Sequence, residues 1–181
     1  HNFNLFSEVA RSQSGGVGAT IGILASLNKR WDATLLFRHF DKNFHSFYAN
    51  GFGESSRNIN ESGIYTGVKY TIHKKMKFGA YVDVYRSPWY RYLVDKKPTN
   101  GFDFLFQNTW TPSKKWAFYA VYRQEHKEHN IPSDLSKQKY VANYTRRNLI
   151  LSAEYTSGRV WSFRTRVQGG TFGYQNFKAD K

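Results

Sequence analysis

Apolar and polar residues alternate along most of this chain, in segments of about ten residues. In residues 17–27, for example, Ile21 and Ile23 alternate with Thr20 and Gly22. Such alternation is typical of a β-strand with one apolar and one polar face. It predicts nine strands, over residues 2–11, 17–27, 31–38, 63–72, 77–84, 102–110, 116–125, 148–155 and 161–168, with residues 171–177 as a candidate tenth.

Short basic turns follow every second strand. They recur roughly every forty residues, and a longer loop rich in Gly, Asn, Ser and aromatic residues separates consecutive turns. Short turns at one end and long loops at the other are typical of strands that thread a membrane in an up-and-down barrel. The turns are residues 27–30, 73–76, 111–115 and 156–159.

The strand length and the tryptophans support the same interpretation. A tilted strand of about ten residues crosses a bilayer. Trp31, Trp110, Trp116 and Trp161 all stand beside the short turns, where an interfacial aromatic girdle on the periplasmic side is expected. We therefore expect an all-β fold, an antiparallel up-and-down transmembrane β-barrel, with residues 1–181 as one barrel region.

A soluble sandwich or a lipocalin-like barrel would also alternate, but it would hide its apolar face in a compact core. The equal strand lengths and the separation of turn lengths favour the membrane barrel. Single-chain bacterial barrels close with an even number of strands, so about nine or ten visible strands predict part of a larger barrel. The start at His1, without a signal peptide, also suggests a mature fragment.

Composition narrows the possible functions. Aromatic residues make up 18% of the chain, and no run of eighteen apolar residues exists, which excludes a transmembrane helix. The absence of Cys excludes a disulfide framework, a thiolate metal site and a cysteine nucleophile. A net charge of +14 suggests polyanionic neighbours such as lipopolysaccharide, nucleic acid or acidic peptides, unless Lys and Arg simply occupy turns and lumen.

Charged residues fall on the polar face of the predicted strands. A Lys or Arg facing lipid near mid-membrane costs about 2–4 kcal/mol, so these charges are expected to face the lumen. They either brace the polar interior by cross-strand pairing or line a pore with a basic bias. The candidate lumen charges are Arg38, Lys69, Asp83, Asp103, Arg123, Glu125, Glu154, Arg164 and Arg166.

Two long loops are candidate binding elements on the extracellular side. Residues 44–61 form either an inward-folded plug or ligand-binding loop, or a loop that packs on itself over the barrel mouth. In the second loop, Trp89, Tyr90 and Arg91 could bind sugars, nucleotides or a partner by stacking and cation–π contact. The alternative is that these aromatic residues stack among themselves at the membrane interface.

The other candidate chemistry is weak. His126 and His129 would lie on opposite faces of a strand, which disfavours a metal site. The Ser, His and acidic residues are too numerous to nominate a hydrolase triad without geometry. No glycine-rich phosphate loop opens a helix. We therefore assign no catalytic residue, metal or cofactor.

Four segments carry a resemblance to a known family: YANGFGESS at 48–56, NESGIY at 60–65, PWYRY at 88–92 and YRQEHK at 122–127. They resemble the barrel portion of a Bacteroidota outer-membrane family whose members are labelled helix-hairpin-helix domain-containing proteins. The resemblance covers about residues 30–130 and implies the later part of a bigger barrel. The helix-hairpin-helix region that precedes the family's barrel is missing here. That region resembles DNA-binding modules of DNA-uptake proteins, and the family offers no catalytic residues to transfer.

These observations predict a non-enzymatic barrel in the outer membrane of a Gram-negative bacterium, acting as a pore or as a membrane subunit of a larger envelope assembly. Its expected partners are membrane lipid, lipopolysaccharide and other envelope proteins. Two alternatives stay open: a DNA-uptake component that binds nucleic acid, and an enzyme acting on lipid or lipopolysaccharide through a Ser/His/acid cluster at one rim.

Overall fold

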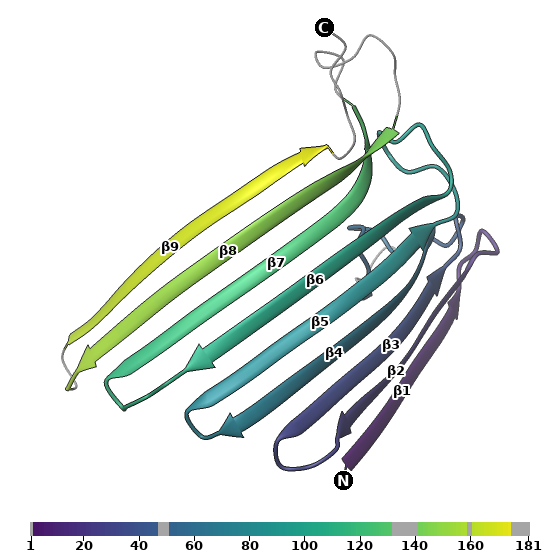
Figure 1. Ribbon diagram of the computed structural model, residues 1–181. Helices are drawn as coiled ribbons and strands as arrows, with labels where there is room; N and C mark the ends of the chain where they lie inside the picture. Colours follow the sequence, from purple (N-terminus) through teal and green to yellow (C-terminus); the bar gives the residue numbers. More distant parts are fainter. Residues whose placement is uncertain (1, 47–50, 132–140, 159–160, 175–181) are drawn as a thin grey trace, which may run out of the picture.

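A computed structural model of the protein describes residues 2–46, 51–131, 141–158 and 161–174. They form one antiparallel sheet in which each strand pairs with the next along the chain (Figure 1). Within this described part there is no helix, and so none that could span a membrane. The strands are β1 (Asn2–Arg11), β2 (Val17–Ser26), β3 (Trp31–Phe40), β4 (Glu61–His73), β5 (Met76–Ser87), β6 (Thr99–Trp110), β7 (Trp116–Asn130), β8 (Val141–Ser157) and β9 (Trp161–Tyr174).

The connections differ between the two ends of the sheet. The β2–β3, β4–β5 and β6–β7 turns lie at one end, beside the N-terminus, and the long β3–β4 and β5–β6 loops lie at the other (Figure 1). One connection at the long-loop end is short, because Ser12 and Gly16 close it with a backbone hydrogen bond of 2.9 Å and Gly15 adopts a φ of 84°. The predicted separation of turn lengths therefore holds except at β1–β2.

One face of the sheet is apolar and exposed. The register places Phe37 opposite Ile64, Ile64 opposite Val84, and Val84 opposite Phe102, so that apolar side chains stand in cross-strand rows. Ile64 and Val84 are each 51% exposed, as is Leu35 in the next row. We call this surface the apolar face. A water-soluble protein rarely exposes so continuous an apolar surface, and the apolar face therefore needs an apolar neighbour.

The opposite face, which we call the charged face, contains the most buried polar side chains. Long side chains there lie flat across a glycine of the neighbouring strand. Arg38 crosses Gly63, where an added Cβ would come within 2.6 Å of the guanidinium carbon, and the Tyr85 ring crosses Gly101 at 2.1 Å. These glycines leave room for the crossing side chains, and Arg38 thereby reaches Asp83 on the second strand along.

The predicted all-β, antiparallel, up-and-down arrangement of nine strands is confirmed. The predicted tenth strand is wrong as far as Tyr174, because backbone pairing with β8 continues past Gly169 and Gly170 and includes residues 171–174 in β9. Residues 175–177 lie outside the described part of the chain. The sheet is also open: within the described residues, β1 and β9 each pair along one edge only, so no closed barrel forms.

We expect Gly101→Ala to lower the free energy of unfolding by about 1–3 kcal/mol, because the new methyl group overlaps the buried Tyr85 ring. The matched control is Gly169→Ala, since nothing lies within 4 Å of a Cβ at Gly169. Urea unfolding in detergent micelles measures both variants. Equal stability of the two would contradict the side-chain crossing at Gly101.

Candidate functional site

A fully buried arginine organises the charged face near the long-loop end. Arg38 on β3 has no exposed surface; its Nε donates to Glu61 Oε1 at 2.6 Å and its Nη1 donates to Asp83 Oδ1 at 2.8 Å. Glu61 begins β4 and Asp83 lies on β5, so one guanidinium links three strands across Gly63. Two carboxylates therefore compensate the cost of burying this cation.

Glu61 also holds the β3–β4 loop against the charged face. Its carboxylate accepts hydrogen bonds from the backbone amides of Glu54 at 3.0 Å and Ser55 at 3.4 Å. The Phe52 ring packs edge-on against Tyr65 with 5.1 Å between the ring centres. Residues 51–57 thus pack against the charged face and not only on themselves.

The same loop reaches a strand on the far side of the face. Glu54 forms an ion pair with Lys127 on β7, and Lys127 also pairs with Glu125 of its own strand. The loop therefore connects β4 with β7 over the intervening strands β5 and β6. The Glu54–Lys127 ion pair holds the loop across the charged face.

The predicted lumen charges all lie on the charged face, and most of them are paired. Asp103 accepts two bonds from Arg123, at 3.0 and 2.7 Å, and one from the Tyr81 hydroxyl at 3.0 Å. Arg166 donates to Gln168, at 3.4 Å, and forms no ion pair within the described part of the chain. The other ion pairs of the set are Lys69–Asp32, Arg164–Glu154, Lys127–Glu125 and the two made by Arg38. This pairing agrees with the bracing interpretation.

The four predicted girdle tryptophans lie on the apolar face beside the short turns. Trp31 stacks on Tyr70 with 4.2 Å between ring centres, and Trp110 and Trp116 both stack on Phe118, at 5.2 and 5.7 Å. Trp161 opens β9. These rings form a band at one end of the apolar face.

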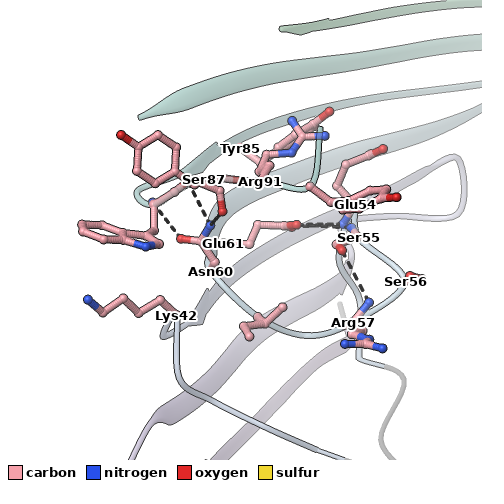
Figure 2. A pocket seen from close by; sticks show the side chains of 14 residues that line it. Lys42, Glu54, Ser55, Ser56, Arg57, Asn60, Glu61, Tyr85, Ser87 and Arg91 are labelled. Atoms are coloured by element: carbon pink, nitrogen blue, oxygen red, sulfur yellow. Dashed lines mark hydrogen bonds between the residues drawn. The ribbon is translucent and has the colours of Figure 1, made fainter. Parts of the chain in front are cut away.

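On the charged side, at the long-loop end of the sheet, a pocket of about 530 Å³ lies between the β3–β4 and β5–β6 loops (Figure 2). Asn60 joins the two loops: its Oδ1 accepts from the Trp89 amide at 2.8 Å, and its Nδ2 donates to the carbonyls of Trp89 and Tyr90 at 3.0 and 3.2 Å. The φ of Asn60 is 55°, a conformation that Asn tolerates better than most residues. The predicted loop residues Trp89, Tyr90 and Arg91 therefore lie together in the pocket wall.

Three cations, Lys42, Arg57 and Arg91, and two carboxylates, Glu54 and Glu61, line this pocket, and Glu54 is already paired with Lys127. Figure 2 shows Lys42 and Arg57 on opposite sides, with Asn60 and Glu61 between them. Glu61 forms an ion pair with Arg38. The Lys42 ammonium instead makes a cation–π contact, 4.1 Å from the centre of the Trp89 ring. The Nη1 atom of Arg91 is buried and has no hydrogen-bond partner among the residues that the structure describes. A small anion would match these cations.

A third polar cluster lies at the same end but on the apolar face. His39 Nδ1 is 2.7 Å from Ser62 Oγ on β4, and His39 Nε2 is 3.2 Å from Asp41 Oδ1. The second oxygen of Asp41 accepts from the Val17 amide at 2.9 Å. This backbone bond, followed by the bond with His39, lowers the pKa of Asp41 below its usual value.

Sequence reasoning missed the residues that connect elements: Glu61, Lys127, Asn60 and the His39 cluster. Glu61 shares the strand phase of Gly63 and Lys69, and that phase alone could have placed it on the charged face. The expected separation of His126 and His129 is confirmed, since His126 pairs opposite Thr145 on the apolar face and His129 lies on the other face.

Comparison with family models, with curated proteins and with solved structures finds no match to this chain. The resemblance to helix-hairpin-helix domain-containing proteins therefore stays a prediction. The function has to be argued from the two faces of the sheet and the clusters on them.

We expect Arg38→Gln to lower the free energy of unfolding by about 3–5 kcal/mol, because it leaves Glu61 and Asp83 buried without a cation. Arg164→Gln is the matched control. Its side chain is 67% exposed, so loss of its pair with Glu154 should cost about 0–1 kcal/mol. Urea titration of both variants measures the difference. Similar losses would show that Arg38 is not the central contact.

Proposed function

We propose that this chain forms part of the wall of a β-barrel in the outer membrane of a Gram-negative bacterium, acting as a pore or as a membrane subunit of a larger envelope assembly. The observation that carries the proposal is the distribution of side chains. Arg38 and Asp103 are buried on one face, while Leu35, Ile64 and Leu151 are about half exposed on the other. Lipid around the apolar face would accommodate this inverted pattern.

The sheet edges support an assembly with further strands. Along the outer edges of β1 and β9, backbone groups have no strand partner within the described residues. In a bilayer every such group must be paired, because no water is present to replace the strand partner. Further strands, from a second copy or from another envelope protein, would satisfy both edges and close the wall.

The charged face would line the lumen. Residues 51–57 would narrow it from the long-loop end, held by Glu61 and by the Glu54–Lys127 pair. The tryptophan band at the short-turn end would lie at the periplasmic interface, with lipopolysaccharide around the long-loop end. In this role the protein binds lipid and envelope proteins and supplies a polar path, and the role itself requires no catalysis.

The two alternative functions differ in their support. A DNA-uptake role depends on free cations, but Arg123 and Arg164 are paired with Asp103 and Glu154, which leaves less positive charge for a polyanion. A lipid-modifying enzyme is favoured by a specific observation, the hydrogen-bonded cluster around His39 at the rim of the apolar face.

We expect Leu35→Lys to weaken insertion into phospholipid vesicles by about 2–4 kcal/mol, because Leu35 lies near the middle of β3 on the apolar face. Thr34→Lys is the matched control, since its side chain points to the charged face of the same strand. Flotation with vesicles after refolding measures the inserted fraction.

Two results would count against the membrane assignment. One is equal insertion of both lysine variants. The other is recovery of the wild-type protein in the soluble periplasmic fraction of cells that express it.

A further inference from the structure

Ser62, His39 and Asp41 form a continuous hydrogen-bonded chain in the order used by serine hydrolases. The hydroxyl of Ser62 is 2.7 Å from one ring nitrogen of His39, and the other ring nitrogen is 3.2 Å from Asp41. A nucleophile beside a base, with the base oriented by a carboxylate, is the geometric signature of acyl transfer. The Val17 amide in turn orients Asp41.

We propose that this cluster is an acyl-ester hydrolase site on the apolar face, at the long-loop rim of the sheet. It lies on the opposite face from the pocket of Figure 2 and from the predicted lumen charges. The side chains of His39 and Asp41 are 42% and 41% exposed, so both substrate and water can reach them.

The register also supplies an electrostatic group. Arg86 on β5 stands directly opposite Ser62, which places the two side chains about 5 Å apart at their base. Arg86 is exposed and forms no ion pair within the described residues. From this register position the long Arg86 side chain can reach Ser62 and stabilise the negative oxygen that forms when the serine attacks a carbonyl.

The neighbouring row defines the class of substrate. Phe37, Ile64 and Val84 lie two residues further into the sheet from His39, Ser62 and Arg86, and each is about half exposed. An acyl chain lying on this row would place its ester carbonyl at the polar rim. We therefore assign the site to carboxylic esters of long acyl chains, a chemistry shared by glycerophospholipids and by the acylated part of lipopolysaccharide.

The reaction balances with the residues present and one water. Ser62 Oγ bonds to the ester carbonyl carbon while His39 Nδ1 takes the hydroxyl proton, and His39 Nε2–H donates to Asp41 throughout. The ester C–O bond then breaks, and the leaving alcohol takes the proton from His39. Water attacks the acyl-serine with His39 again accepting a proton, which returns to Ser62 Oγ as the fatty acid leaves.

The hydrolase site depends on the proposed membrane position only for its natural substrate. Two assays therefore test the hydrolase site and the membrane position separately. The first uses the full chain in detergent micelles with the chromogenic ester p-nitrophenyl palmitate and requires no bilayer. We expect hydrolysis, together with covalent labelling of Ser62 by a fluorophosphonate that peptide mass spectrometry locates. Activity in micelles without membrane insertion would contradict the proposed function alone.

Variants assign the roles. Ser62→Ala and His39→Asn should lower kcat at least about a hundredfold. Asp41→Asn keeps an acceptor for the Val17 amide, so it should lower kcat and the rate of labelling while leaving KM unchanged, as expected of a positioning residue. Arg86→Gln should lower kcat about a hundredfold without preventing the labelling of Ser62.

The chain provides a matched control. His126 and Thr145 form the same kind of cross-strand contact on the same face at 2.8 Å, but no carboxylate hydrogen-bonds to this His126 within the described residues. His126→Asn should therefore leave turnover within twofold of wild type. Turnover in Ser62→Ala equal to wild type, or a folded wild-type protein that neither hydrolyses the ester nor labels at Ser62, would overturn the proposal.

The second assay identifies the source of the ester. Fatty-acid release is measured from phosphatidylglycerol vesicles and from lipopolysaccharide, each with wild type and with Ser62→Ala. Ser62-dependent release from either substrate supports the site and names its source. Release from neither, by a protein shown to be inserted in the vesicles, would overturn the assignment to the esters of phospholipid and lipopolysaccharide.

Discussion

Burying a cation is costly unless other groups replace its hydration, and the position of the β3–β4 loop depends on one buried arginine. Arg38 is held between Glu61 and Asp83 with no exposed surface. Because Glu61 also binds the loop amides, the same ion pairs that join β3, β4 and β5 draw residues 51–57 onto the charged face. The pocket wall at Asn60 follows from that placement.

The two faces of the sheet have opposite relations to their surroundings. On the charged face, Arg38 lies across Gly63 and pairs with Asp83 two strands away, and the Tyr85 ring lies across Gly101. Polar groups thus become buried there beside a few apolar side chains such as Leu36 and Val121. On the apolar face, side chains stand outward in rows and remain exposed. This inversion is the physical reason for placing lipid on one side and an aqueous lumen on the other.

The rim of the apolar face carries a polar cluster where the membrane interface would lie. Among the described residues, cross-strand contacts between histidine and a hydroxyl occur twice on this face, at His39–Ser62 and at His126–Thr145. Only in the first does the described structure add a carboxylate. It can do so because β3 ends at Phe40 and the chain turns back at Asp41 towards the Val17 amide. Asp41, the first residue after β3, thus distinguishes the candidate catalytic contact at His39–Ser62 from the structural contact at His126–Thr145.

The sequence by itself determined the strands, their order and the two faces, because alternation has a period of two and reports local conformation directly. It placed Trp31 on the apolar face and Arg123 on the charged face for the same reason. It missed the length of β9, since Gly169 and Gly170 interrupt the side-chain pattern without interrupting backbone pairing. Only the tertiary structure decided which residues meet across the long β3–β4 loop. A loop of that length leaves the register open, and the register is what brings Ser62 to His39 and Glu61 to Arg38.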